Sequence, residues 1–555
     1  MQPRRLRLAF QPTLAAATVA VLALLVALPA QARTGRPASA RGNYVAQGYP
    51  HLGYAIHRLL RAPDAVRAHW GISVATLSGR QVFALNDHQY FHPASNAKLF
   101  TTAATLDLFK PDARWRTTVT TTGAISPDGT LHGNVVIHGS GDPTLSSRIY
   151  PYDGQTERQP DALTAFENMA DQLVKDGIHR IDGNIIGDDT WFVDQPYGEG
   201  WALDDTIWDY GAPASALTIN DNVVYLNVVP AGAPGLPNEP GAQPQRFITP
   251  TGTEDVEWNP PTPYYHLDNE TSLLRTGVGR VGLDRRPGSH TVRLYGTIDQ
   301  NGFHAGLAII DPARYTAETF AMLLRQRGIQ ITGIAQAHHL FSTDTRRFRN
   351  RVNQPIALHP ITDTILGPPT DGQHVLASYI SRATLAQDLK VTLKVSQNLH
   401  AELYLRDLGR YEAGDGSIAQ GARVVHQFAI EAGVNPTGFI FFDGSGMSHD
   451  DVVTPHAVTT LLAYASHQSW GRIYRNALPV GGVDGTLSDR FTSPAMRRRV
   501  NAKTGTLDED NALSGYVKSR TGRTYVFSIF CNARNPDSEA VLKVMDQVVK
   551  AIASE

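Results

Sequence analysis

The chain has 555 residues, too many for one ordinary domain, and this length predicts about three or four. Its 50 Lys and Arg residues nearly balance its 52 Asp and Glu residues. This balance argues against a basic surface for nucleic acid and against an acidic disordered tail, so any binding site must be local.

The N-terminal segment has the pattern of a secretory signal peptide. A short basic stretch precedes an apolar run over about residues 14–28, and a small-residue cleavage pattern ends at Ala32. The run is short for a spanning helix, so cleavage before Arg33 is predicted rather than an uncleaved membrane anchor. The residue directly after the cleavage pattern is not a cysteine, which argues against a lipoprotein. We expect a periplasmic or otherwise exported protein without an integral membrane span after cleavage.

Two strands and then a helix are predicted next. Residues 69–85 ("HWGISVATLSGRQVFAL") predict two strands around a turn. Ser95 and Lys98 follow at the start of an apolar segment, and residues three apart share one face of a helix. Apolar residues on several sides are typical of a buried helix, so the amine should be partly desolvated. The alternative is that Ser95 caps the helix and Lys98 reaches water.

The segment over about 112–365 is predicted to be an insertion. It has strands of its own, a Pro- and Gly-rich tract near 230–244, and two similar units in which glycine ends a helix before a strand. Two such units with a β-rich piece between them predict an inserted α/β domain that carries a nested domain.

The last part of the chain supplies two more short motifs. "SQN" begins at Ser396 and taken alone is an ordinary helix start, and "KTG" begins at Lys503 in the first of three predicted strands. The only cysteine, Cys531, lies in the third strand, has no partner for an internal disulfide, and is expected in the core. A final helix with one buried face is predicted over about 541–552.

Strands from both ends of the chain can close into one antiparallel five-stranded sheet covered by helices. The predicted fold class is therefore a multidomain α/β protein in which the insertion interrupts this sheet domain. The expected division is a signal peptide at 1–32, a discontinuous catalytic domain at 33–111 and 366–555, an inserted α/β domain at 112–365, and a nested β-rich domain at about 225–315.

Three motifs in one order give the strongest functional signal. The order Ser-x-x-Lys, Ser-x-Asn, Lys-Thr-Gly is that of serine penicillin-binding enzymes and class A β-lactamases. Each motif is weak alone, but all three occur in a fitting local context. They are Ser95-x-x-Lys98, Ser396-x-Asn398 and Lys503-Thr504-Gly505.

The residue types suit acyl transfer. Ser95 needs a neighbouring base to become a nucleophile. Lys98 can be that base if burial and the charge of Lys503 lower its pKa, although which group takes the proton is disputed in such enzymes. Ser396 is placed to pass the proton to the departing amine. Asn398 is placed to hold the substrate amide and to orient Lys98.

A substrate carboxylate has candidate partners on the predicted KTG strand. Lys503 and Thr504 can present a cation and a hydroxyl. Gly505 leaves room for a close approach. The backbone N–H groups of Ser95 and Thr506 are the expected oxyanion hole.

Together the motifs resemble peptidase family S13, the class C penicillin-binding proteins with D-alanyl-D-alanine carboxypeptidase and endopeptidase activity. The resemblance runs from about residue 50 to the end and implies a penicillin-binding transpeptidase-like fold for the discontinuous domain. The long insertion between Ser95 and Ser396 separates the chain from β-lactamases. Further similar segments lie at 139–145, 187–192, 212–222 and 441–448.

The resemblance implies peptidoglycan stem peptides ending in D-Ala-D-Ala, or crosslinks between stems, as substrates and β-lactams as inhibitors. It also implies that an acidic residue of the insertion reads the free amino end of the stem. Asp189 is the candidate and Asp188 the alternative. Asp189 can also be an ordinary aspartate in a turn, without a role in substrate binding. His449 stands where the family usually has an arginine for the substrate carboxylate, which puts binding by a permanent charge there in doubt.

Two other functions stay open from the sequence. One is a non-hydrolytic penicillin-binding sensor, which would need fewer of these residues, and the other is a serine β-lactamase-like hydrolase. No H-E-x-x-H pattern and no phosphate-binding loop occurs in the chain, so no metal and no cofactor is expected.

Overall fold

A computed structural model describes residues 44–46, 48–63, 65–154, 162–231, 245–249, 251–535 and 539–555. The predicted signal peptide, residues 1–32, and its cleavage site lie outside the described residues. In the described part of the chain, no helix is both long enough and apolar enough to span a bilayer.

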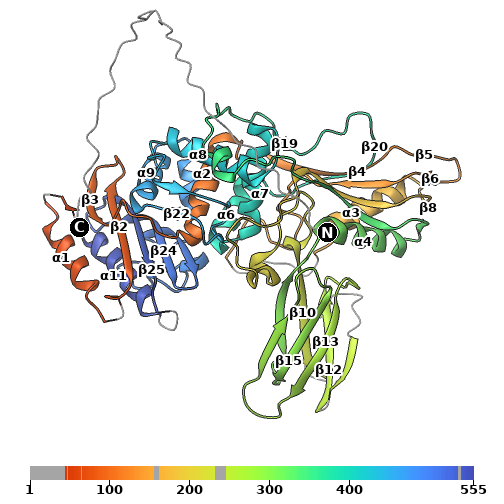
Figure 1. Ribbon diagram of the computed structural model, residues 1–555, viewed down its shortest axis with the longest axis horizontal. Helices are drawn as coiled ribbons and strands as arrows, with labels where there is room; N and C mark the ends of the chain where they lie inside the picture. The colour runs from red at the N-terminus through yellow and green to blue at the C-terminus, as the bar shows by residue number, and fades with distance from the viewer. Residues whose placement is uncertain are drawn as a thin grey trace, which may run out of the picture. The chain divides into compact units, whose positions relative to one another are not determined.

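A mixed α/β architecture with several sheets confirms the predicted fold class (Figure 1). The five strands predicted at the two ends of the chain pair in one antiparallel sheet, and a short strand near the N-terminus adds a sixth at its edge. In order across the sheet they are β1 (Tyr44–Val45), β3 (Gln81–Leu85), β2 (His69–Thr76), β25 (Thr524–Asn532), β24 (Asp510–Lys518) and β23 (Val500–Leu507).

Helices cover both faces of this sheet because its strands are apolar on both sides. Along β25, Phe527 and Ile529 pack with α1 and α11, whereas Val526 and Phe530 face the cluster of α2 and α9. The helices of this region are α1 (Pro50–Leu59), α2 (Lys98–Leu108), α5 (Phe348–Val352), α6 (Leu385–Val395), α7 (Asn398–Ala413), α8 (Ile418–Glu431), α9 (Pro455–Ala465), α10 (Gly471–Ala477) and α11 (Ala540–Ser554), with a small pair of strands, β21 (Phe439–Ile440) and β22 (Val452–Val453).

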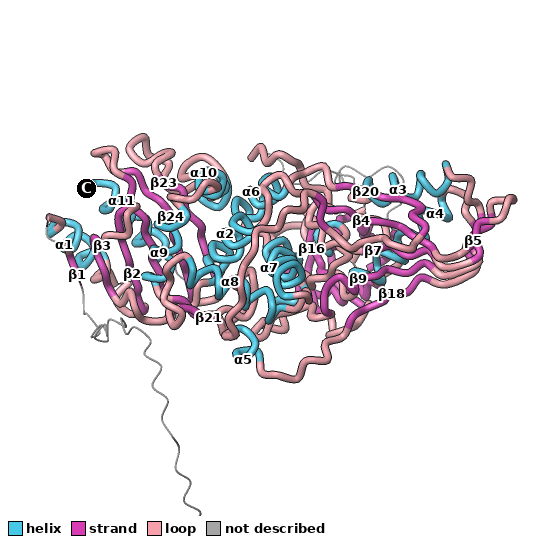
Figure 2. The backbone as a smooth tube through the Cα atoms, turned by 90° about the horizontal axis from the view of Figure 1, so that it is seen from above, coloured by secondary structure: helices cyan, strands magenta, loops and turns pink. Residues whose placement is uncertain are grey.

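Helix α2 is the buried helix that the sequence predicts. Every residue of α2 except Asp107 is buried, and α2 packs against α7, α8 and α9. Seen from above, α2, α6 and α7 lie between the six-stranded sheet and the strands of the insertion (Figure 2). The start of α2 therefore lies in the interior of the protein.

The insertion has its own sheets and helices. Its larger sheet has the order β18-β9-β7-β4-β19, and β20 also pairs with β4, although the predicted domain boundary at 366 assigns β20 to the catalytic region. Helices α3 and α4 pack against this sheet. The elements are β4 (Arg114–Thr121), β7 (Val135–His138), β9 (Ile185–Val193), β18 (Ala335–Leu340), β19 (Ile365–Leu366), β20 (His374–Ile380), β5 (Ala124–Ile125), β6 (Thr130–His132), β8 (Arg180–Ile181), β17 (Gln330–Ile331), α3 (Thr164–Lys175) and α4 (Pro312–Gln326).

Two further sheets occupy the stretch expected to be β-rich (Figure 1). Alternating apolar residues of their strands, among them Leu226 and Val292, join the same apolar core as α3 and α4. The strands are β10 (Val223–Pro230), β11 (Gln245–Thr249), β12 (Gly252–Asn259) and β16 (Phe303–Ala308) in one sheet, and β13 (His266–Leu273), β14 (Arg280–Asp284) and β15 (Thr291–Ile298) in the other.

Cys531 gives a direct test of the core between the six-stranded sheet and helices α1 and α11. Its side chain lies on β25 in the cluster beneath α11, and burial raises the pKa of its thiol to about 12. We expect the thiol to resist a thiol-specific disulfide reagent in the folded protein and to react at once in guanidinium chloride, because the thiolate is the reactive form. Release of the reagent's chromophore measures both rates, and fast reaction of the folded protein would contradict this core.

Candidate active site

Ser95 and Lys98 lie side by side, as the spacing of their motif predicts. Ser95 is in a short 3-10 helix (Ala94–Ala97) that leads into α2, and Lys98 is the first residue of α2. The Lys98 Nζ lies 2.8 Å from Ser95 Oγ and donates to Asn398 Oδ1 at 2.6 Å and to the Ser445 carbonyl at 2.7 Å. Ser95 makes no side-chain cap of the helix, so the alternative reading from the sequence does not hold.

Burial sets the charge state of the Lys98 amine. Its side chain is fully buried, and desolvation lowers the pKa of Lys98 to about 7, although the carboxylates of Asp443 and Glu402 act in the opposite direction. Burial, and then the charge of Lys98, also lowers the pKa of Lys503. The desolvated Lys98 amine is therefore available as a neutral base near neutral pH.

Ser396 connects the two lysines through Ser95. Its Oγ donates to Ser95 Oγ at 2.9 Å and accepts from Lys503 Nζ at 2.8 Å. Ser396 lies between α6 and α7 with a φ of +64°, a left-handed conformation that L side chains rarely adopt. This backbone strain turns the hydroxyl toward Ser95, as is common at catalytic sites.

The KTG strand, β23, closes the site from the other side. Besides Ser396, the Lys503 Nζ donates to the Thr504 carbonyl at 2.7 Å. A Cβ on Gly505 would lie 2.8 Å from the Pro93 carbonyl, so this glycine lets β23 pack directly against the segment that leads to Ser95. Thr506 is exposed beyond it.

The insertion reaches the site through Tyr210, which the sequence analysis missed. Its carbonyl accepts from Asn398 Nδ2 at 2.8 Å, and its hydroxyl donates to Asp205 Oδ1 at 3.0 Å. Burial raises the pKa of the Asp205 carboxyl, although the Tyr210 hydrogen bond acts in the opposite direction. The only sequence signal was the similar segment 212–222, which begins two residues later.

The sequence analysis also missed the residues that hold the Ser445 carbonyl. Glu402 Oε1 accepts from the backbone N–H groups of Gly444 and Ser445 at 2.8 Å each, and Arg406 Nη1 donates to Glu402 Oε2 at 2.9 Å. Glu402 and Arg406 are almost wholly buried. The sequence signals for them were the segment 441–448 and, on α7, a glutamate and an arginine four residues apart.

A second buried network joins α7 to the insertion. The His400 ring lies 3.2 Å from Asp221 Oδ1 and 3.0 Å from Asp388 Oδ1. Burial lowers the pKa of His400, but the two carboxylates outweigh it and raise it to about 9. Arg148 and Tyr150 donate to these carboxylates at 2.8 and 2.6 Å. The network therefore links the insertion to the helix that begins with Asn398.

The structure does not bring Asp189 or Asp188 together with Ser95. Asp189 is buried on β9, where it accepts from Ser215 Oγ at 2.9 Å and lies 2.9 Å from His339 Nδ1. Asp188 is 3.3 Å from His138 Nδ1. These partners all belong to the insertion, so the expected reading role of either aspartate remains a prediction.

His449 lies at the edge of the site. Its backbone N–H donates to the Gly200 carbonyl at 3.0 Å, and its Nε2 lies 3.9 Å from a carboxylate oxygen of Asp508, just beyond β23. About a third of its side chain is exposed, at 36%. The ring is therefore accessible to a substrate but already faces a carboxylate of the protein.

Comparison with known proteins agrees with this geometry. Residues 52–343 and 361–554 match the model of the D-Ala-D-Ala carboxypeptidase 3 (S13) family. A D-alanyl-D-alanine carboxypeptidase of Actinomadura sp. (strain R39) is 28% identical over 516 residues, covering 90% of this chain and 84% of the relative. D-alanyl-D-alanine carboxypeptidase DacB of Haemophilus influenzae is 25% identical over 471 residues, covering 83% and 85%.

A solved structure shares the fold. The crystal structure of penicillin binding protein 4 (dacB) from Haemophilus influenzae matches with a TM-score of 0.68 and 19% identity, covering 90% of this chain and 98% of that one. The family match extends over both the motif-bearing regions and most of the insertion. This chain belongs to the D-Ala-D-Ala carboxypeptidase 3 (S13) family.

Proposed function

We propose that the protein is an exported serine peptidase that releases the terminal D-alanine of peptidoglycan stem peptides, or opens crosslinks between stems, through an acyl-enzyme on Ser95. The observation that carries the proposal is the unbroken series of contacts from Lys503 through Ser396 and Ser95 to the buried amine of Lys98. The names of the relatives support the substrate. A β-lactam complex of the Haemophilus influenzae protein supports inhibition by β-lactams.

In acylation, Ser95 Oγ attacks the carbonyl carbon between the two D-alanines while Lys98 Nζ takes its proton. The C–O bond forms as the carbonyl electron pair moves to the oxygen, where the N–H groups of Ser95 and Thr506 are the expected donors. The C–N bond then breaks, the leaving nitrogen gains the proton of Ser396, and the proton held by Lys98 replaces it. Asn398 keeps the Lys98 amine directed at Ser95 throughout.

Deacylation repeats these steps with water. Water adds to the ester carbonyl while one of its protons passes to the neutral Lys98 amine. The bond from the carbonyl carbon to Ser95 Oγ then breaks, and Ser95 Oγ takes that proton from Lys98, which restores the starting state.

The terminal carboxylate of the substrate needs partners that reach the cleft. The Lys503 amine is buried behind Ser396 and the Thr504 carbonyl. We therefore expect the hydroxyls of Thr504 and Thr506 and the ring of His449 to receive the carboxylate directly, with Lys503 adding positive charge from behind.

For the amino end of the stem, Asp205 fits the reading role better than Asp189. Asp205 is connected through Tyr210 to Asn398, whereas Asp189 is held by Ser215 and His339. A carboxylate that is already paired with a histidine forms a weaker ion pair with a substrate ammonium.

Ser95→Ala tests the acyl-enzyme. We expect the variant to release no D-alanine from a pentapeptide and to take no label from a fluorescent penicillin, because among the described residues Ser95 has the hydroxyl that is hydrogen-bonded to the Lys98 amine. Amino-acid analysis and gel fluorescence measure the two. Labelling of the unchanged protein without D-alanine release would instead favour the sensor, and rapid loss of the label would favour a β-lactamase.

The pH dependence tests the role of Lys98. Its amine accepts a proton only when neutral, and its pKa lies at about 7, so kcat/KM for D-alanine release should rise with pH and level off above about 7. Lys98→Arg should be inactive at every pH, because a guanidinium stays charged. A rise centred near the ordinary lysine value of about 10.4 would rule out this base.

Asp205→Asn tests the reading of the stem. It should raise KM by roughly tenfold or more for a peptide with a free side-chain amine, since a hydrogen bond to a charged group is worth about 1.5–3 kcal/mol. KM for the same peptide acetylated at that amine should not change. Asp189→Asn is the matched variant, and a larger effect there would return the role to Asp189.

A further inference from the structure

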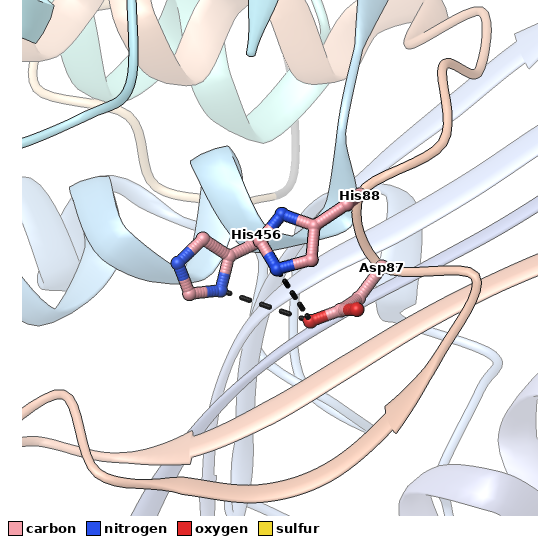
Figure 3. A group of neighbouring side chains, drawn as sticks. All are labelled: Asp87, His88 and His456. Carbon is pink, nitrogen blue, oxygen red and sulfur yellow. Dashed lines mark ion pairs between the residues drawn. The ribbon is translucent and has the colours of Figure 1, made fainter. Parts of the chain in front are cut away.

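Three potential metal ligands from distant parts of the chain meet behind the segment that leads to Ser95. Asp87 and His88 follow β3, and His456 is the second residue of α9. Both rings lie beside the carboxylate in Figure 3. Asp87 Oδ2 is 4.0 Å from His88 Nε2 and 3.7 Å from His456 Nδ1, and the three candidate ligand atoms lie within 4.8 Å of one another.

The backbone and a neighbouring amide hold this arrangement in place. The His456 N–H donates to the Asp87 carbonyl at 2.9 Å, and Phe91 and Val453 exchange two backbone hydrogen bonds nearby. Gln81 Nε2 donates to Asp87 Oδ2 and so orients the carboxylate. A group that hydrogen-bonds a ligand in this way is typical of metal sites.

The burial of the three side chains suits a site at the surface. The Asp87 side chain is 6% exposed, whereas those of His88 and His456 are 58% and 40% exposed. The carboxylate is therefore fixed and both rings are free to adjust. The solvent side leaves room for water to complete the coordination.

The donor set is the one that Zn²⁺ takes. Zn²⁺ binds imidazole nitrogen and carboxylate oxygen at about 2.0–2.2 Å, which places neighbouring ligands of a tetrahedral site roughly 3.3–3.5 Å apart. To reach these separations, the ring nitrogens must move about 0.2–0.7 Å toward Asp87 and, from within 4.8 Å of each other, approach one another by up to about 1.5 Å.

We propose that Asp87, His88 and His456 bind a divalent first-row transition metal, Zn²⁺ by its ligand preference, which links the segment before Ser95 to helix α9. The sequence does not reveal this site because 368 residues separate His88 from His456, as 456 − 88 = 368. The site is separate from the group around Ser95 and Lys98 and does not depend on the proposed reaction.

The test uses the full mature protein, stripped of metal with a chelator and then titrated with Zn²⁺. We expect calorimetry to show zinc binding and the melting temperature to rise with zinc concentration, because a ligand of the folded state stabilises it. His88→Ala and His456→Ala should each weaken zinc binding by at least about tenfold, the loss that even outer-sphere changes cause at metal sites.

His51→Ala is the matched control. His51 is exposed and follows Pro50 as the second residue of α1, just as His456 follows Pro455 in α9. This variant should bind zinc as the unchanged protein does. Melting temperatures without zinc show whether each variant is folded.

Three results would overturn the proposal. The unchanged protein could fail to bind zinc, or His88→Ala and His456→Ala could bind it equally well. Binding lost in His338→Ala but kept in His88→Ala would locate the metal at Asp188, which has His138 and His338 at 3.3 and 3.6 Å. Cobalt(II) added to each protein gives a second readout, because its weak visible absorption in water becomes much stronger when protein ligands hold the ion in a four- or five-coordinate site.

Discussion

The removal of one amine from water is the constraint around which this active site is arranged. Helix α2 is apolar on nearly all sides, so its first residue, Lys98, enters the interior together with the rest of the helix. A buried ammonium is costly, and the chain lowers that cost by giving the amine three oxygen partners and a pKa near neutrality. Other residues in turn hold each of these oxygen partners in place.

The residues that hold these oxygen partners account for several features of the fold. Glu402 is a buried carboxylate because it fixes the loop that offers the Ser445 carbonyl. Gly446 has a φ of +81°, and a Cβ there would meet the Ala94 carbonyl at 1.9 Å, so only glycine lets this loop pass beside the Ser95 turn. The insertion contributes Tyr210 to the other partner, Asn398. Lys98 is thus positioned by segments from three distant parts of the chain.

Local patterns account for what the sequence predicted well. Ser95 and Lys98 are three residues apart on one helical turn, and the strands at both ends have clear apolar patterns, so the sheet, the buried helix and the family resemblance could all be predicted. Tyr210 and Glu402 could not, because their roles depend on contacts across the fold. The prediction of Asp189 rests on a segment pattern that carries no information on its neighbours in space.

The network around His400 bears on how the protein folds. Asp221 comes from the insertion, and Asp388 and His400 come from helices of the catalytic region, all fully or almost fully buried. Joining the chain across the insertion would remove Asp221, the second carboxylate at His400, and the Tyr150 hydroxyl that donates to Asp388, so the buried pair of His400 and Asp388 would lose hydrogen-bond partners at a cost in free energy. We therefore expect the insertion and the helices that carry Asp388 and His400 to unfold together rather than as separate modules.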